Sequence, residues 1–145
     1  MKKYLQNKLN NEKGMTLIEL LAVIVIIAII AAIAIPAIGN IIENSRFGAA
    51  KSDFLNAHSA ASLYKADENK LPSLTTVEPK TTLDKLKAGY LDDAGTLTEL
   101  TFTPDNSNFK IAGTFKINEE TYTLEAVTKV ELTNMSSSEF KEATK

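Results

Sequence analysis

The sequence predicts an α+β fold in which one long N-terminal helix packs against a small antiparallel β-sheet of three or four strands. Apolar residues fill one early stretch and then recur every three or four positions until about residue 66, which is the period of an α-helix. Between residues 97 and 133 apolar and polar residues alternate instead, which is the period of a β-strand.

The early apolar stretch is long enough to cross a membrane. From Leu20 to Ile42 there are 23 residues without a formal charge, and as a helix they would reach about 35 Å, more than the roughly 30 Å of a hydrocarbon core. A removed secretory signal usually has a shorter apolar core followed by small residues. A buried globular helix is disfavoured because the remaining residues are too few to surround a helix that is apolar on every side. A retained membrane segment is therefore favoured.

The charges on either side of this segment differ in sign. Four lysines and Glu12 give +3 before Met15, which leaves −5 for the rest of a chain with a formal charge of −2. Because cytoplasmic loops carry the excess of Lys and Arg, the N-terminus is expected inside and residues from Glu43 onward outside. The acidic remainder argues against general binding to nucleic-acid phosphates.

The residues around the start of the apolar stretch resemble the prepilin signature of type IV pilins and pseudopilins. Lys13-Gly14 precedes Met15-Thr16-Leu17-Ile18-Glu19, and Pro36 interrupts the run that follows, so the resemblance covers about residues 8–46. It implies that a prepilin peptidase removes residues 1–14 at the Gly14–Met15 bond and methylates the new amino terminus of Met15. The family usually has Phe where this chain has Met15.

The resemblance also implies the organisation and partners of the mature chain. Residues 15–42 would form a transmembrane and assembly stem, and residues 43–145 an extracellular head. The chain would form a homopolymer whose stems pack in its centre, with the help of an assembly ATPase and an inner-membrane platform protein. The absence of cysteine differs from many Gram-negative pilins, in which a disulfide closes a C-terminal loop, and favours a Gram-positive source.

Glu19 is a carboxylate at the edge of the apolar stretch, where an unpaired charge costs free energy and usually has a function. Within the resemblance, its partner is the Met15 ammonium of a neighbouring subunit. Such a pair would fix the axial register, because other registers leave a charge buried and unpaired. Alternatively, Thr16 and Glu19 form a capping box at the start of the helix. Both roles can hold in turn, before and after assembly.

Pro36 and Gly39 lie late in the apolar stretch. Pro removes a backbone hydrogen bond and Gly lowers helix stability, so residues 33–39 are expected to be the softest part of the helix. They either extend or melt when subunits pack, or form a kink that a membrane helix tolerates.

The same helix is expected to continue to about Ala66, and its part in the head, residues 43–66, should place one apolar face under the sheet. That face consists of Phe47, Ala50, Phe54, Ala57, Ala61 and Tyr64. Residues 67–91 should hold a loop, 69–79, and a short helix, 82–88, that ends at Gly89.

The remaining head should be mostly sheet, over residues 97–133. Strands are expected at 97–103 and 109–117, and a turn at 118–120 leads into a third strand that reaches Leu132. The inward residues of that third strand are expected to be Tyr122, Leu124, Ala126, Val130 and Leu132. The tail, 134–145, is expected to be loose, although Phe140 could dock.

No catalytic, cofactor or metal site is expected. The one histidine, His58, has no second His or Cys to share a metal, so a structural or surface role is favoured. Asp92-Asp93 and Glu119-Glu120 are expected to be solvated turn residues, and Asp92 to Thr96 lacks the ligands of a calcium loop.

Two functions remain. The favoured one is a major pilin that builds a fibre for adhesion, twitching motility or biofilm. The alternative is a pseudopilin of a competence or type II-like secretion machine, and only there would DNA be a partner. The 131 residues that follow residue 14, together with Glu19, favour the major pilin.

Overall fold

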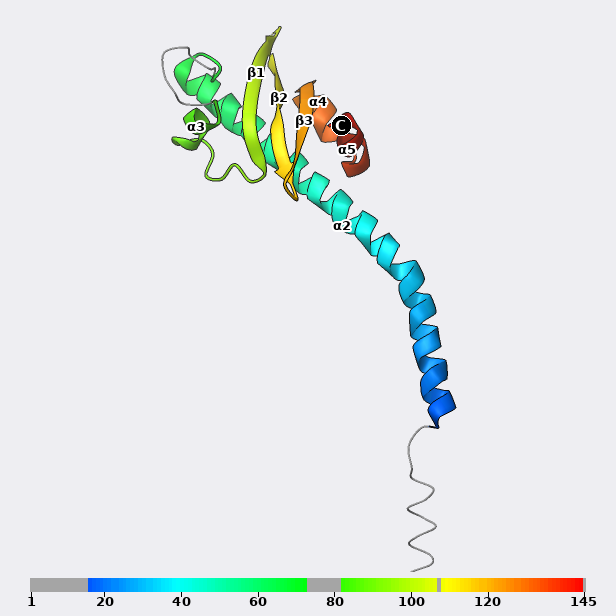
Figure 1. Ribbon diagram of the computed structural model, residues 1–145. Helices are drawn as coiled ribbons and strands as arrows, with labels where there is room; N and C mark the ends of the chain where they lie inside the picture. Colours follow the sequence, from blue (N-terminus) through cyan, green and yellow to red (C-terminus); the bar gives the residue numbers. More distant parts are fainter. Residues whose placement is uncertain (1–15, 73–81, 107, 145) are drawn as a thin grey trace, which may run out of the picture. The chain divides into compact units, whose positions relative to one another are not determined.

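The structure is a computed structural model that describes residues 16–72, 82–106 and 108–144 (Figure 1). The elements, in chain order, are α2 (Leu17–Glu68), α3 (Thr82–Lys87), β1 (Leu97–Asp105), β2 (Asn108–Ile117), β3 (Glu120–Thr128), α4 (Lys129–Asn134) and α5 (Ser137–Ala143). The strands form one antiparallel sheet in the order β1-β2-β3. The predicted α+β class, a long helix packed against a small antiparallel sheet, is confirmed.

Helix α2 has 52 residues and runs without interruption through Pro36 and Gly39. It begins and ends within two residues of the expected bounds, Thr16 and Ala66. The chain divides into two compact units between Ile41 and Ile42. Helix α2 contributes to both units, which are described separately; the second is called the head below.

The core of the head forms between α2 and the inner face of the sheet. Of the expected helix face, Phe47, Ala50, Phe54, Ala57 and Ala61 are buried and Tyr64 is half-buried. The Phe115 ring on β2 meets the rings of Phe47 and Phe54 edge-on, with centroids 6.1 and 5.7 Å apart. Edge-to-face pairs of this kind add about 0.5–1.5 kcal/mol each beyond the buried area.

The β2–β3 hairpin closes through two residues. Asn118 (φ 52°) and Glu119 (φ 71°) both have left-handed backbones, as the tight hairpin turn that matches strand twist requires. Farther along, the register shifts between Ile111, opposite Val127, and Gly113, opposite Leu124. This β-bulge inserts one residue into β3.

Because of the bulge, the expectation that Ala126 points inward is wrong. Ala126 is exposed, and Val127 is half-buried and packs against the core instead. A strict alternation of period two does not survive an inserted residue, because every later side chain moves to the other face.

The expected third strand is also too long. Residues 129–134 form α4, so Val130 is exposed on a helix, whereas Leu132 is buried. The reason is local: the Thr128 hydroxyl accepts a hydrogen bond from the Glu131 backbone N–H, and the Glu131 carboxylate accepts one from the Thr128 N–H. This capping box starts a helix where the apolar pattern alone suggested strand.

The expectation of a loose tail is wrong. Ser136 and Glu139 form a second capping box, and α5 follows. Phe140 is fully buried, with its ring 6.0 Å from that of Phe54 and 5.6 Å from that of Phe115. The helix is therefore stabilised by its cap and by one aromatic anchor in the core.

Helix α3 precedes strand β1 in the chain. It ends at Lys87, and Gly89 follows with φ 152°. Leu91 is buried and Tyr90 is half-buried. Most of the expected loop at 69–79 lies outside the described residues.

Candidate assembly site

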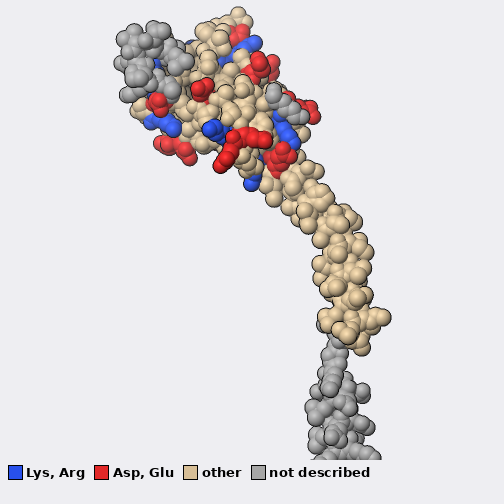
Figure 2. All heavy atoms as spheres, in the orientation of Figure 1, with Lys and Arg blue, Asp and Glu red and all other residues tan. Residues whose placement is uncertain are grey.

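The first unit presents an apolar surface that no other described residue covers. Between Leu17 and Ile42 the large apolar side chains are exposed, for example Leu17 by 87 % and Ile33 by 72 %. In the face shown in Figure 2 this part of α2 carries no basic side chains, whereas Lys, Arg, Asp and Glu gather on the head. The helix is long and apolar enough to cross a membrane by length and composition, with a mean hydropathy of 3.2 over its best window. A helix of this kind needs a covering partner, either lipid or other helices.

Glu19 lies in the first turn of α2, at the start of this surface. Its Oε2 atom accepts hydrogen bonds from the Thr16 backbone N–H (2.6 Å) and the Thr16 hydroxyl (3.0 Å). The Thr16 carbonyl also accepts the backbone N–H groups of Glu19 and Leu20 at 2.9 and 3.1 Å. Thr16 therefore precedes the helix as a cap residue, and Glu19 performs half of a capping box.

The other half of a capping box would be a hydrogen bond from the Glu19 backbone N–H to the Thr16 hydroxyl; here that N–H donates to the Thr16 carbonyl instead. Within the described part of the chain, Glu19 uses only Oε2 in hydrogen bonds. A carboxylate can accept through both oxygens. Oε1 can thus accept a hydrogen bond from a cationic group while the hydrogen bonds between Oε2 and Thr16 are kept. The expected cleavage and methylation residues, Gly14 and Met15, lie outside the described residues.

Pro36 and Gly39 lie in the exposed part of the helix, and no break occurs at either position. A Cβ atom added at Gly39 would meet nothing within 4 Å. No contact among the described residues therefore requires glycine there. Whether this stretch softens on assembly or only tolerates a kink stays a prediction.

His58 belongs to the core of the head. It is 2 % exposed, and its ring stacks on that of Phe109 with a centroid distance of 4.2 Å and an angle of 14°. Burial lowers the pKa of His58 below 6.5, and the positive charge of Lys129 lowers it further, while the nearby backbone of Phe109 and of His58 offsets part of this. Neither ring nitrogen has a hydrogen-bond partner among the described groups.

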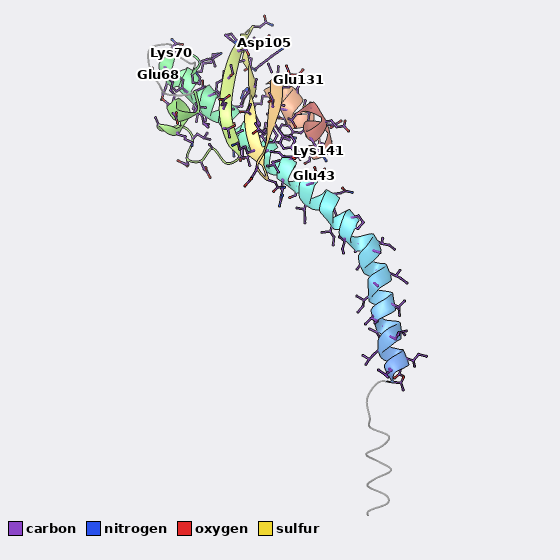
Figure 3. The ribbon with its side chains drawn as sticks, viewed as in Figure 1. Glu43, Glu68, Lys70, Asp105, Glu131 and Lys141 are labelled. Atoms are coloured by element: carbon purple, nitrogen blue, oxygen red, sulfur yellow. The ribbon has the colours of Figure 1, made fainter. Side chains whose placement is uncertain are left out.

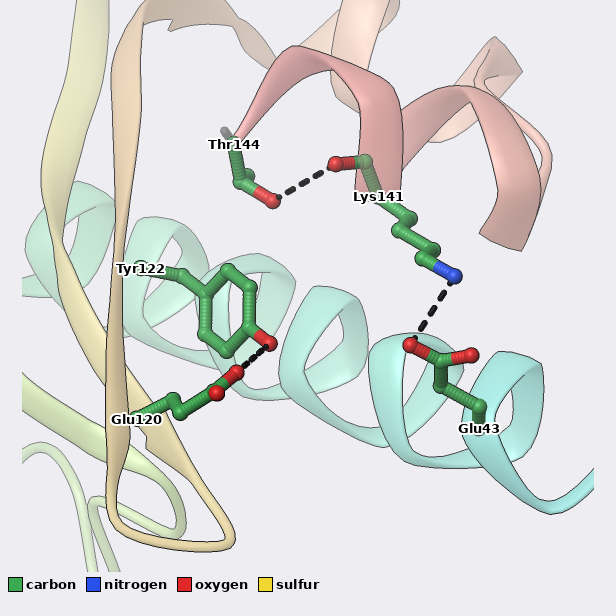
Figure 4. Close-up of polar contacts among 5 residues, drawn as sticks. All are labelled: Glu43, Glu120, Tyr122, Lys141 and Thr144. Carbon is green, nitrogen blue, oxygen red and sulfur yellow. Dashed lines mark hydrogen bonds and ion pairs between the residues drawn. The ribbon is translucent and has the colours of Figure 1, made fainter. Parts of the chain in front are cut away.

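The acidic pairs at the turns have local roles. The Asp93 carboxylate accepts the backbone N–H of Gly95 at 3.0 Å, and Glu120 accepts the Tyr122 hydroxyl at 2.6 Å (Figure 4). The hydrogen bond to Glu120 raises the pKa of Tyr122 above 10.0. Across residues 16–72, 82–106 and 108–144, no three His, Cys, Asp or Glu side chains gather as they would around a metal ion.

Two of the charged contacts that α2 makes with distant residues connect it to the C-terminal helices, and neither was expected from the sequence. Glu43 and Lys141 form an ion pair at 2.9 Å that joins α2 to α5 (Figures 3 and 4). The Lys51 ammonium donates to the carbonyl oxygens of Thr133 and Met135 at the end of α4. Both join residues more than 80 positions apart, so no local sequence signal could have revealed them.

The N-terminal geometry defines a class of protein with an exposed apolar helix, a capped acidic residue at its start and a folded helix–sheet head. A family model described as the prokaryotic N-terminal methylation motif matches residues 9–35. The chain therefore carries a type IV pilin-like N-terminal signal. Comparison with curated proteins and with solved structures found no match.

Proposed function

We propose that this protein is a structural subunit of a type IV pilus, which polymerises through its N-terminal helix into an extracellular filament for adhesion, twitching motility or biofilm. The observation that carries the proposal is the methylation motif at residues 9–35, combined with the exposed apolar surface of α2 from Leu17 to Ile42. The protein would have a structural role and would not be an enzyme.

The precursor would sit in the cytoplasmic membrane with its N-terminus inside. A prepilin peptidase would cut between Gly14 and Met15 and methylate Met15. The apolar part of α2 would first be covered by lipid and then, after action of the assembly ATPase and the platform protein, by the same segment of neighbouring subunits. Cutting before the apolar stretch retains it for assembly. The lack of cysteine supports a Gram-positive source.

Glu19 would act in both states. In the membrane its Oε2 atom would cap the helix through Thr16, a role that the hydrogen bonds at 2.6 and 3.0 Å support. In the filament the carboxylate would pair with the Met15 ammonium of a neighbour. A mismatched register leaves both charges unpaired in apolar surroundings, which costs several kcal/mol, so the pair would select one axial step.

The alternative, a pseudopilin of a competence or secretion machine, has the same N-terminal signal. Deletion of the gene separates the two. Loss of long, abundant surface fibres by electron microscopy, with antibody against the head labelling wild-type fibres along their length, supports the major pilin. Intact fibres together with loss of DNA uptake or protein secretion would support the pseudopilin.

A further inference from the structure

The head has a surface cavity close to the point where the apolar part of α2 ends. Its volume is about 320 Å³, and it is lined by Arg46, Ala49, Thr96, Lys116, Ile117 and Asn118. These residues come from α2, the segment before β1, and β2 with its turn. The Lys116 backbone N–H donates to the Thr96 carbonyl at 3.0 Å, which ties two walls of the cavity together.

The cavity contains two cations and no carboxylate. Arg46 donates through Nη1 to the Oδ1 atom of Asn118, and the tight hairpin turn fixes Asn118 in a left-handed backbone. Neither Arg46 nor Lys116 forms an ion pair with a carboxylate within the described ranges. The nearby Asp53 carboxylate does not line the cavity and accepts the backbone N–H and the hydroxyl of Thr96, both at 2.8 Å. The cavity lining therefore has two cations that no ion pair among the described residues neutralises.

The chemistry of these groups favours a phosphate. One hydrogen bond to Asn118 orients the Arg46 guanidinium but leaves most of its five N–H donors for a ligand. The planar fork of Arg suits two phosphate oxygens at once, and Lys116 adds a point charge.

The position of Arg46 along α2 indicates where that phosphate comes from. Arg46 follows Ile42, the last residue of the apolar stretch, by four residues, which is a rise of about 6 Å in a helix. The headgroup layer on each side of a bilayer is also about 5–7 Å thick. A membrane segment that ends at Ile42 would thus place Arg46 at the level of lipid phosphates.

The geometry points to a binding site for the phosphate of an anionic phospholipid, formed by Arg46, Lys116 and Asn118 and occupied while the subunit is anchored in the membrane. This inference rests on the membrane insertion in the proposed function and adds a specific lipid contact to it. The contact holds the base of the head at one height at the membrane surface before assembly.

The test uses the full chain in phosphatidylcholine vesicles that contain a minor fraction of spin-labelled phosphatidylglycerol or spin-labelled phosphatidylcholine. Electron paramagnetic resonance measures the motionally restricted fraction of each lipid. Each cation near an anionic surface gives about a fivefold preference, so Arg46→Gln with Lys116→Gln should lose up to about 25-fold of the preference for phosphatidylglycerol. Arg46→Lys keeps the charge without the fork and should lose only part of it.

The matched control is Lys87→Gln with Lys110→Gln, which removes the same charge from exposed or half-exposed positions outside the cavity. It should keep the wild-type preference, and circular dichroism should be the same for all variants. An unchanged preference for phosphatidylglycerol in the Arg46 and Lys116 double variant would overturn the inference. Displacement of phosphatidylglycerol by inorganic phosphate would also overturn it, because the cavity would then bind a soluble ligand.

Flotation with the vesicles separates this inference from the proposed function. A chain that floats but shows no preference for phosphatidylglycerol overturns the lipid site alone. A chain that fails to float overturns the membrane insertion and the lipid site with it. Filament formation plays no part in either readout.

Discussion

The Lys51 ammonium on α2 donates to the Thr133 carbonyl at 3.0 Å and also to the Met135 carbonyl, so one cation binds the C-terminal end of α4. The last carbonyls of a helix lack partners within it and carry partial negative charge. Helix α4 has six residues and is too short to be stable alone. Lys51 therefore fastens the C-terminal part of the head to the long helix.

Lys51→Met should destabilise the head by about 1–3 kcal/mol, because it keeps the apolar part of the side chain but removes the hydrogen bonds of a charged donor to one exposed and one half-buried carbonyl. The measurement is urea unfolding of the full chain in detergent micelles, followed by near-ultraviolet circular dichroism. Lys87→Met is the control, since Lys87 is exposed on α3, and it should change the free energy of unfolding by less than about 0.5 kcal/mol. Equal effects of the two substitutions would contradict the role of Lys51.

Gly113 lies in β2 where another backbone approaches closely. A Cβ atom added there would be 2.3 Å from the Glu99 carbonyl oxygen and 3.2 Å from the Phe54 ring. Because the first contact is with backbone, relief requires β1 to move. Gly113→Ala should destabilise the head by about 1–3 kcal/mol, measured by the same urea unfolding.

Gly39→Ala is the matched control for Gly113→Ala, since a Cβ at Gly39 meets nothing within 4 Å. It should leave the head stability unchanged and raise the helix propensity of its segment by about 1 kcal/mol. It also tests the softening of residues 33–39. If that stretch must melt on assembly, Gly39→Ala should lower the number of filaments per cell while the membrane level of the subunit stays normal. Normal filament numbers would favour a tolerated kink.

His58 predicts a dependence of head stability on pH. Its pKa in the folded chain lies below 6.5 because of burial and of Lys129, so the unfolded chain binds the proton first as pH falls. The free energy of unfolding should therefore decrease below about pH 6.5 and level off once folded His58 also titrates. The capping carboxylates Glu131 and Glu139 act in another window, since their pKa values lie below 4.5 and their contribution is lost only as pH falls below that value.

His58→Phe isolates the effect. Phenylalanine keeps a ring on Phe109 and removes the titrating group, so stability between pH 6.5 and 5 should become flat. Chemical denaturation at a series of pH values measures it. A slope in that range that survives in His58→Phe would assign the effect to other groups.

Several features of the head could be predicted from local pattern, and others could not. The period of apolar residues in α2 and the alternation in β2 were sufficient for the helix and the first two strands. The Thr128-x-x-Glu131 and Ser136-x-x-Glu139 patterns are present in the sequence. Their capping boxes explain why these segments form α4 and α5 instead of the expected strand and loose tail. By contrast, the bulge opposite Gly113 and the cavity that joins Arg46 to Lys116 depend on register between distant segments, which no local window contains.

Substitutions at Thr16 and Glu19 can separate the two proposed roles of the Glu19 carboxylate, helix capping and pairing with a neighbouring subunit. Thr16→Val removes the hydroxyl that donates to Oε2 at 3.0 Å but keeps the backbone N–H that donates at 2.6 Å. It weakens the cap and leaves the charge of Glu19 available to a neighbouring subunit. If the filament contact is what matters, cells with Thr16→Val should still assemble filaments.

Glu19→Ala and Glu19→Gln should both leave the subunit in the membrane but block filaments, since neither side chain can neutralise the Met15 ammonium of a neighbour. Gln is the more informative variant, because its amide oxygen can still accept from Thr16 and so retains the local cap. Membrane fractions probed with antibody against the head measure the subunit level, and electron microscopy counts filaments. Normal filaments in Glu19→Gln, or their loss in Thr16→Val alone, would show that helix capping rather than charge pairing is the contribution of this turn to assembly.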